Sequence, residues 1–228
     1  MYDLYSKLKK YSLEDAVNFE ERDRQFLALK NLYQNKLFDD KNYLFLTIAN
    51  ALICYQLSGK GEVYWEEFDT ALQGKQINNF LDIKIFFKDF LSTSKNNKRF
   101  SKVKLNRINK LEKFYITFLQ STEIYYRDMT LLRRDLASTM NQQEEAKTVV
   151  FAVKMFSYSA RNVFDYLEYF SKDLMLPIDS RLEKLYQRHN GDSKREIKEF
   201  YIELSKKLDI PLLHLDAVLW VNYQDLIK

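Results

Sequence analysis

The chain of 228 residues has a mass of 27.5 kDa and is 46% hydrophobic, which supports one domain of ordinary size or two small lobes and excludes a largely disordered protein. Its net charge of +4, from 36 basic and 32 acidic residues, is a mild bias toward polyanions. The four glycines form neither GxGxxG nor GxxxxGK[ST], so the phosphate-cradling loops of nucleotide-binding folds are excluded. Because a chain with four glycines and two prolines cannot easily supply the turns of a sandwich or barrel, we expect an all-α fold.

The helical segments, in chain order, follow from the hydrophobic periodicity. In the 193–208 segment, Ser193-x-x-Glu196 has the form of a capping box, and Pro211 follows the end of the helix. Helices are expected over residues 13–36, 42–58, 62–73, 77–92, 101–119, 122–138, 146–171, 180–188, 193–208 and 212–227.

Cysteine and histidine are scarce. The single cysteine, Cys54, excludes an internal disulfide framework, and with only His189 and His214 beside it no Cys/His zinc pattern exists. We interpret Cys54 as a buried small hydrophobe and both histidines as structural, and we expect no metal and no cofactor. Residues 1–15 show no apolar signal core and the best apolar run, 43–57, contains a polar residue, so we expect a cytoplasmic protein with no membrane partner.

The stretch from residue 95 to residue 113 is strongly basic, with Glu112 as its single acid. Its cations are suited to follow a phosphate backbone, because each one that neutralises a phosphate also releases a counterion. The alternative is a solvated helix face around a loop. We favour that alternative, because aromatic residues suited to base stacking do not appear interleaved with the cations.

The segment that begins at Lys147 is apolar nearly all round and does not resemble a plain core helix. One stripe is ordinary core: Val149, Val153, Phe156, Ala160 and Val163. A second face carries Lys147, Phe151, Lys154 and Tyr158, so an aromatic side chain separates two lysines. An ammonium on this face either snorkels to water or is held in a cleft, where desolvation beside a second cation is how a lysine becomes an amine nucleophile.

With these residues in view, the chain resembles the archaeal 8-oxoguanine DNA glycosylase/lyase family, the archaeal GO glycosylases, a divergent branch of the helix-hairpin-helix glycosylases. The resemblance covers most of the chain and rests on five sequence blocks: ERDRQF (21–26), ALICYQLSGKGEVYWEEF (51–68), EEAKTVVFAVKMFSYSAR (144–161), LPIDSR (176–181) and IPLLHLDAVLWV (210–221). The second block and the third, which contains the lysine helix, are the most specific.

The resemblance implies a helix-hairpin-helix glycosylase fold, a single domain over 1–228 with two helical lobes. One lobe, about 66–175, would carry the hairpin and the lysine, and the other would join 1–65 to 176–228. Most helix-hairpin-helix glycosylases hold the DNA phosphate with a glycine-rich hairpin, but STMNQQEEAK before the lysine helix has no glycine. This branch of the superfamily is known for a noncanonical hairpin, so the absence of glycine agrees with the resemblance.

The resemblance also implies a role for each matching residue. Lys147 matches the lysine that forms the Schiff base, and Asp179 matches the catalytic aspartate. Trp65 and Trp220 match two indoles that sandwich the extruded base, and Phe151 matches an aromatic at the pocket floor. The residues that match polar groups orienting the base or the lysine are Gln25, Lys154 and Asp216.

Each of these residues also has an ordinary interpretation. Trp65 and Trp220 are typical core anchors, and Asp216 and Trp220 share one face of a simple amphipathic helix. Asp179 precedes what looks like a capping box, Ser180-x-x-Glu183, and is then a helix-start residue. Gln25 by itself is a surface residue.

The function that the resemblance implies is excision of 8-oxoguanine by attack of Lys147 on C1′, followed by strand cleavage by β-elimination, with damaged DNA as the partner and a monomer as the simplest assembly. Two alternatives remain open. One is a glycosylase of the same fold for another damaged base, and the other is a noncatalytic helical DNA-binding module whose lysines only contact phosphates.

Overall fold

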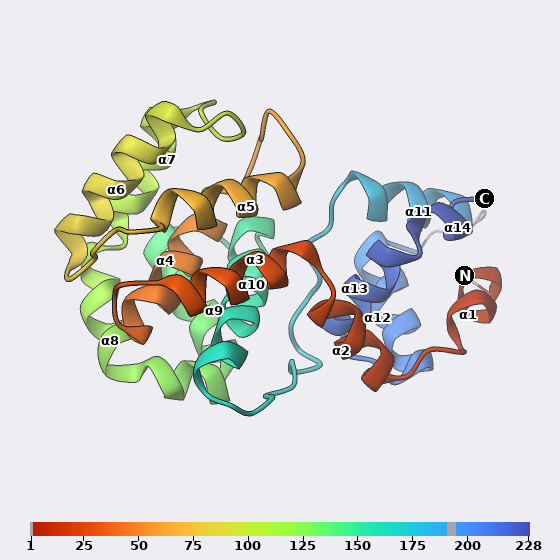
Figure 1. Cartoon of the computed structure of the whole chain (residues 1–228). Helices are drawn as coiled ribbons and strands as arrows, with labels where there is room; N and C mark the ends of the chain where they lie inside the picture. Colours follow the sequence, from red (N-terminus) through yellow and green to blue (C-terminus); the bar gives the residue numbers. More distant parts are fainter. Residues whose placement is uncertain (1, 191–194) are drawn as a thin grey trace. The chain divides into compact units, whose positions relative to one another are not determined.

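The computed structural model describes residues 2–190 and 195–228, and these residues form helices and no strands (Figure 1). Two compact units are present. Residues 24–169 form the unit that carries Lys147, called here the lysine unit. Residues 1–23 and 170–228 form the terminal unit. None of the helices formed by the described residues is long and apolar enough to cross a membrane.

The lysine unit is built around α4 (Asp40–Leu52), in which every residue from Asn42 to Leu52 is buried. The longest helix, α10 (Lys147–Val163), packs against α4, and α3 packs against α5. The other helices of this unit are α3 (Arg24–Asn35), α5 (Gly61–Leu72), α6 (Phe80–Thr93), α7 (Ser101–Lys110), α8 (Glu112–Arg127) and α9 (Met129–Met140).

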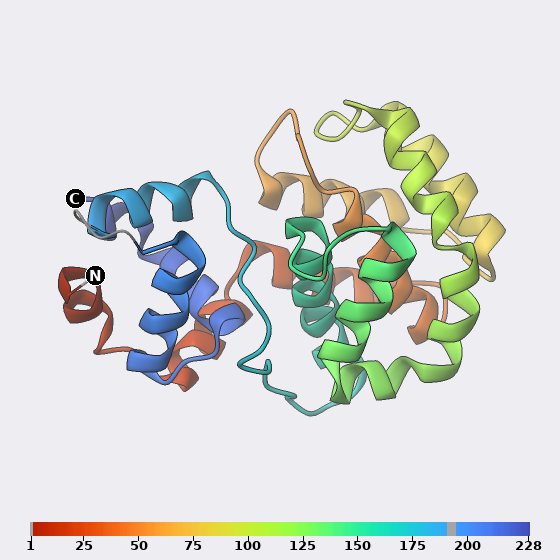
Figure 2. The ribbon, with the colours of Figure 1, turned by 180° about the vertical axis from the view of Figure 1, so that it is seen from behind.

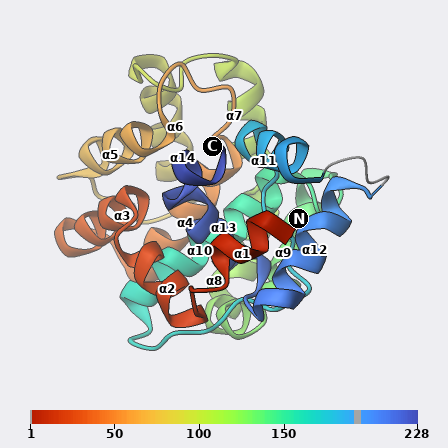
Figure 3. The ribbon, with the colours of Figure 1, turned by 90° about the vertical axis from the view of Figure 1, so that its right-hand side faces the viewer.

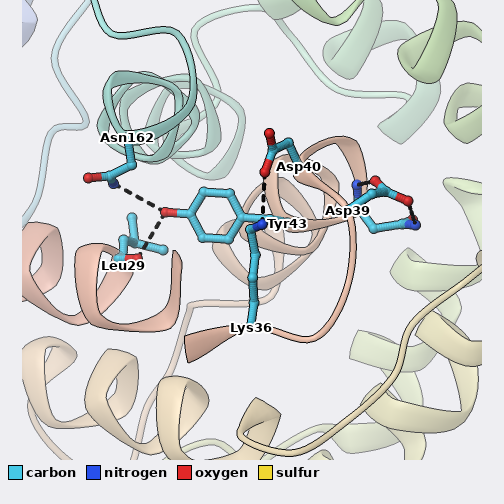
Figure 4. A network of polar contacts seen from close by, with 7 residues as sticks. Leu29, Lys36, Asp39, Asp40, Tyr43 and Asn162 are labelled. Carbon is cyan, nitrogen blue, oxygen red and sulfur yellow. Dashed lines mark hydrogen bonds and ion pairs between the residues drawn. The ribbon is translucent and has the colours of Figure 1, made fainter. Parts of the chain in front are cut away.

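A buried hydroxyl joins three helices of the lysine unit (Figure 4). Tyr43 on α4 donates to the carbonyl oxygen of Leu29 on α3 at 3.0 Å, and its oxygen accepts from the amide of Asn162 on α10 at 3.3 Å. Burial raises the pKa of Tyr43, so the hydroxyl stays protonated and keeps its donor. Near it, the start of α4 is capped by Asp39, which accepts from the backbone N–H of Asn42, and Lys36 pairs with Asp40 at 2.8 Å. This network fixes α10 relative to α3 and α4.

The hairpin between α9 and α10 turns without glycine (Figure 2). Asn141 takes the left-handed conformation after α9, with φ 52° and ψ 53°, where helices commonly place glycine. The N–H of Gln142 then donates to the carbonyl of Ala137 at 2.9 Å and closes the helix end. Asparagine tolerates this conformation better than most residues with a side chain, which explains how the expected glycine-free hairpin is made.

The terminal unit joins the two ends of the sequence (Figure 3). It contains α1 (Tyr2–Leu8), α2 (Leu13–Glu21), α11 (Ser180–Asn190), α12 (Ile197–Leu208), α13 (Leu212–Val221) and α14 (Tyr223–Leu226), and α2 packs closely on α13. Across that contact, His214 lies 2.9 Å from the Glu20 carboxylate, both fully buried. The other ring nitrogen accepts the N–H of Phe170 at 3.1 Å, so His214 is a structural cross-link of this unit.

The helix boundaries differ from the sequence expectation at several points. The segment expected as 13–36 breaks at Arg22, and the one expected as 42–58 ends at Leu52. The lysine helix ends at Val163, well before residue 171, and α1 was not expected. Periodicity detects a buried stripe but not the local turn that interrupts it, since the apolar pattern of one helix can continue into the next helix.

The division into units also differs from the expected lobes. Residues 24–65 belong to the lysine unit, and the boundaries fall after Asp23 and Tyr169. The physical reason is α4, whose all-round burial requires neighbours on every side and places it in the core beneath α10. The expected capping box at Ser193 lies outside the described residues. Helix α12 begins after Glu196, which forms a box with Glu199.

Candidate active-site residues on the two units

Lys147 is the first residue of α10, and its side chain is exposed. The helix face expected from the sequence is present on α10, and the exposure of its side chains falls along the helix. Phe151, one turn further, is partly buried, and Lys154 and Tyr158 are buried at 4% and 0% exposure. Of the two alternatives for Lys147, snorkelling or enclosure, the described structure therefore shows an ammonium open to solvent.

The start of α10 is held by an arginine from the basic stretch. Arg107 on α7 donates to Thr148 Oγ1 at 2.9 Å and to Gln142 Oε1 at 2.8 Å. Thr148 in turn donates to the same Gln142 oxygen at 3.2 Å. These three side chains link α7, the hairpin and the residue next to Lys147, so the backbone that carries the amine is fixed.

The deeper lysine of this face is enclosed by aromatic and cationic neighbours. The Lys154 ammonium lies 5.4 Å from the centre of the Tyr158 ring, and the Arg161 guanidinium lies at the same distance from that ring. Phe26 of α3 meets Tyr158 edge to face at 5.6 Å. The arrangement brings Lys154 next to the helix that carries Gln25.

Trp65 on α5 is fully buried, as a core anchor would be. Its indole meets the Phe151 ring at 6.3 Å and 63°, and it also packs edge to face on Phe68. In the described structure the indole therefore supports Phe151 from the interior and offers no open face. The structure brings Trp65 and Phe151 together.

Cys54, expected as a buried small hydrophobe, lies next to these residues and is partly buried. Desolvation raises its pKa to about 12, opposed by the positive charges of Lys104 and Lys147 and by the Trp65 indole. The thiol is therefore protonated near neutral pH. The charges of Lys104, from the basic stretch, and of Lys147 both act on this thiol, so both ammonium groups lie near Cys54.

Gln25, on the first turn of α3, is buried at 8% exposure, so its interpretation as a surface residue was wrong. Its amide lies against the start of α5. A Cβ at Gly61 would stand 3.3 Å from Gln25 Nε2, closer than most real contacts of a Cβ. The glycine at position 61 therefore leaves space for this amide, a relation that depends on how α3 packs against α5 and that no local pattern reveals.

In the terminal unit, Asp179 caps α11. Its Oδ1 accepts the backbone N–H groups of Arg181 at 2.9 Å and Leu182 at 3.0 Å. The cap is therefore Asp179, and the expected box with Ser180 as cap was wrong, because Ser180 is already the first helical residue. Within the described part of the chain, Oδ2 accepts no hydrogen bond, so the carboxylate is oriented through one oxygen and keeps the other available.

A small pocket of the terminal unit brings Asp179, Asp216 and Trp220 together. Trp220 is partly exposed, and the Arg181 guanidinium lies 3.4 Å from the centre of the indole, in a stacked position. Asp216 is buried at 9% exposure, one turn before Trp220 on α13. Both carboxylates contribute to raising the pKa of the buried Tyr201, after desolvation, which indicates that they share one neighbourhood.

Comparisons with known proteins show the family to which the chain belongs. Residues 5–227 match the AGOG family, described as N-glycosylase/DNA lyase. The chain belongs to this family. Proteins named N-glycosylase/DNA lyase are similar to it: one from Methanococcus maripaludis is 36% identical over 92% of this chain and 82% of its own length. Another from Nanoarchaeum equitans is 37% identical over 93% of this chain and 86% of its own length.

A solved structure confirms the fold. The crystal structure of Pa-AGOG, an 8-oxoguanine DNA glycosylase from Pyrobaculum aerophilum, in complex with 8-oxoguanosine superposes with a TM-score of 0.82. The two chains are 23% identical, and the match covers 97% of this chain and 86% of the other. The expected all-α glycosylase fold is thus confirmed. As an AGOG family member the chain is an N-glycosylase and DNA lyase, which removes the alternative of a noncatalytic module.

Three residues to which the sequence analysis assigned no role lie beside the candidate active-site residues of this AGOG protein. Arg181 covers Trp220, Arg107 holds the start of α10, and Lys104 lies near Cys54. Arg181 stands two residues after Asp179 in LPIDSR, so its proximity was the one available indication. The other two were hidden within a run of surface cations, where sequence does not show which side chains point inward.

Proposed function

We propose that this AGOG protein excises 8-oxoguanine from DNA with Lys147 as nucleophile and then cleaves the strand at the same site. The observation that carries the proposal is the placement of Lys147: an exposed primary amine on the fixed first turn of a buried helix, one turn from an aromatic ring. The choice of lesion is supported by the 8-oxoguanosine complex of Pa-AGOG and by the family.

Capture of the base requires that the nucleotide first leave the duplex, which costs a few kcal/mol of stacking and pairing. Stacking on an aromatic side chain returns about 1 to 3 kcal/mol per base. We assign this contact to Trp220 and Phe151, the two partly exposed aromatic candidates, and we assign to Trp65 the support of Phe151. The Arg181 guanidinium lies where a base on that face of Trp220 would stack and must move aside for it.

Stacking does not distinguish 8-oxoguanine from guanine, because the two bases have nearly the same face. The lesion differs at its edge, where N7 carries a proton and C8 carries an oxygen. We propose that the Gln25 amide reads this edge, since it offers both an acceptor and donors. When normal guanine enters, the acceptor that meets N7–H is left unsatisfied, at a cost of about 1 to 3 kcal/mol. Lys154 and Asp216 orient the base or the amine.

In the chemical step, Lys147 gives up a proton and its amine attacks C1′ of the deoxyribose while the N-glycosidic bond breaks, and the base leaves with the bonding electrons and takes up a proton. Asp179, with its free oxygen, stabilises the positive charge that develops on the sugar. The amine then forms an imine with the opened sugar, and loss of a C2′ proton eliminates the 3′ phosphate. A carboxylate held by two backbone N–H groups is preorganised for this electrostatic role.

Borohydride reduction tests the nucleophile, because it converts the imine to a stable amine. A duplex with a single 8-oxoguanine should give a covalent protein–DNA adduct with the wild-type protein, and Lys147→Gln should give none. Lys147→Arg keeps the charge but cannot form the imine, so it should also give none. The matched control is Lys110→Gln, an exposed lysine of the same unit, which should trap as the wild type does.

A panel of lesions tests the substrate. Duplexes that carry an alkylated purine or an oxidised pyrimidine should react much more slowly than the 8-oxoguanine duplex. Reaction with these lesions and none with 8-oxoguanine would establish the alternative, a glycosylase of the same fold with another target.

We also propose that the enzyme acts as a monomer on DNA in the cytoplasm, where it associates with the nucleoid. The proposed residues all come from one chain, so no second copy is needed to complete them. Sedimentation of the free protein should give a single species of about the chain mass of 27.5 kDa.

A further inference from the structure

The turn before α7 and its first residues carry an exposed, wholly basic surface. Lys95, Lys98, Arg99 and Lys102 are all exposed, and no acidic residue occurs between positions 95 and 111. We call these four residues and Phe100 the α7 ridge. The ridge belongs to the lysine unit, where its turn lies beside the loop over residues 53–60 (Figure 1).

The turn is fixed from beneath by one carboxylate. Glu67 on α5 accepts the Ser94 hydroxyl at 2.9 Å, the backbone N–H of Lys95 at 2.6 Å and the side-chain amide of Asn96 at 2.8 Å. The hydroxyl of Ser94 in turn accepts the N–H of Asn97 at 2.9 Å. The polar groups that face inward are thus used to build the turn, and the ridge side chains are left pointing outward.

Neighbouring contacts hold the turn against the adjacent loop. The N–H of Ser58 donates to the Asn96 carbonyl at 2.8 Å, and a Cβ at Gly59 would clash with the Asn96 side chain. The buried Lys104 ammonium donates to the Asn97 side-chain oxygen and lies 4.9 Å from the centre of the Tyr55 ring. Lys104 therefore supports the turn from the inside and is not part of the ridge.

Phe100 distinguishes the ridge from an ordinary solvated face. Its backbone is left-handed, with φ 57° and ψ 32°, a conformation that is unfavourable for a bulky residue, and its ring is 57% exposed. A residue held in this conformation persists only where its surroundings determine it. The turn therefore presents a large apolar ring to solvent between Arg99 and Lys102. Our sequence interpretation, which found no suitable aromatic among the cations, missed this ring.

The ridge is connected to the start of the lysine helix. Arg107, two turns along α7 from Phe100, donates to Thr148, the residue next to Lys147. The charges of Lys104 and Lys147 both act on the Cys54 thiol, so α7 and the first turn of α10 share one neighbourhood. A strand bound at Lys147 thus has a basic surface beside it on the same unit.

We infer that the α7 ridge binds the DNA strand that flanks the lesion, with its four cations on backbone phosphates and the Phe100 ring stacked on an unpaired or unstacked base. The inference rests on the proposed function, which supplies the DNA. Charge complementarity fits a polyanion, and an exposed ring among cations is the combination by which proteins bind single-stranded or distorted nucleic acid.

The salt dependence of binding tests the cations. Fluorescence anisotropy of an 8-oxoguanine duplex is measured between about 50 and 200 mM salt in the Lys147→Gln background, which prevents turnover. Substitution of Lys98, Arg99 and Lys102 together by alanine should reduce the slope of log affinity against log salt by about 2.7, since each lost phosphate contact removes about 0.9. The control has the same charge loss elsewhere on the unit: Lys30, Lys75 and Lys88, all exposed, changed to alanine. It should change the slope by less than about 1.

The ring is tested separately. Phe100→Ala should weaken binding by about 5-fold to 150-fold, the range for one base stacked on an aromatic side chain, without changing the salt slope. Phe100→Gly removes the ring and also relieves the left-handed backbone, so it should fold at least as well and bind equally weakly. Ile116→Ala, which removes an equally exposed apolar side chain from α8, is the control and should bind as the parent does.

Borohydride trapping with an intact Lys147 separates the two possible failures. If the wild type traps 8-oxoguanine DNA and the ridge variants bind no differently from their controls, the ridge assignment is overturned and the proposed function stands. If the wild type gives no adduct with any 8-oxoguanine duplex, the proposed function fails.

Discussion

The two units hold their candidate groups by different physical means. In the lysine unit, Lys147, Phe151 and Lys154 lie along one face of α10, and their exposure falls toward the buried Lys154. Gln25 and Trp65 lie on α3 and α5, and aromatic packing holds Trp65 against Phe151. In the terminal unit they lie at a helix start and on a neighbouring helix, and backbone N–H groups orient Asp179. The lysine unit therefore depends on core packing and the terminal unit on local hydrogen bonds. Substitution of the buried Trp65 should consequently affect folding, and substitution of Asp179 or Trp220 should mainly affect chemistry or binding.

The two tryptophans give the largest expected contrast. Trp65→Ala removes a fully buried indole and should lower the free energy of unfolding by about 3 to 5 kcal/mol. Trp220→Ala removes a partly exposed ring, so its main effect should be on DNA affinity, about 1 to 3 kcal/mol for one stacked base. Urea denaturation and duplex binding of both variants provide the measurement. Equal losses of stability in the two variants would remove the distinction between a supporting and a stacking indole.

The capping aspartate allows chemistry to be separated from folding. Asp179→Asn keeps an oxygen that caps α11, because asparagine is as good an N-cap as aspartate, but it loses the charge. We expect single-turnover base release to fall by about 100-fold to 1,000-fold with little change in stability. Asp179→Ala should in addition lower the unfolding free energy by about 1 kcal/mol. A wild-type rate in the asparagine variant would show that Asp179 serves only as a cap.

The buried cation of the lysine unit makes stability depend on pH. Desolvation lowers the pKa of Lys104 to about 8, below the unfolded value of about 10.4. Between these values the unfolded chain binds more protons than the folded one, so the wild type gains stability as pH rises from about 8 to about 10. In Lys104→Met this gain is absent. The unfolding free energy of the variant minus that of the wild type should therefore fall by about 2 kcal/mol between about pH 8 and pH 10, in paired urea titrations. A constant difference would contradict a desolvated ammonium.

The smallest expected effect concerns the glycine beside Gln25. Gly61→Ala places a Cβ 3.3 Å from the Gln25 amide nitrogen and should displace that amide by a few tenths of an ångström. We expect the ratio of 8-oxoguanine to guanine excision rates to fall by about threefold to tenfold, because a hydrogen bond that is partly lost costs about 1 kcal/mol. Gly74→Ala alters a glycine of the same unit that has nothing within 4 Å and a φ of 70°, so it strains the local backbone without contacting Gln25 and should leave the ratio unchanged.

Much of the fold could be predicted from the sequence, since few turn-forming residues and clear apolar stripes indicate helices. The lysine helix and its buried stripe of Val149, Val153 and Phe156 follow from periodicity alone. The break at Arg22 could not be predicted, because α2 and α3 continue one apolar pattern across different units. The inclusion of α4 in the lysine unit depends on tertiary packing against α10, which periodicity does not report.

The resemblance predicted which residues are candidates, but it did not predict their burial, side-chain direction or backbone conformation. Gln25 is polar and its burial depends on Gly61, which is far away in the sequence. The inward direction of Lys104 and Arg107 depends on partners at Asn97 and Thr148. The left-handed backbone of Phe100 also has no sequence signature, since such a conformation normally selects glycine or asparagine.

Locating the covalent bond tests most directly whether Lys147 is the nucleophile. The wild-type protein is incubated with an 8-oxoguanine duplex in the presence of borohydride, the adduct is digested with protease and nuclease, and the modified peptide is sequenced by mass spectrometry. We expect one reduced sugar fragment on the ε-amine of Lys147. A fragment on Lys154, on Lys104 or on the N-terminal amine would contradict this expectation, as would efficient base release with no adduct at all.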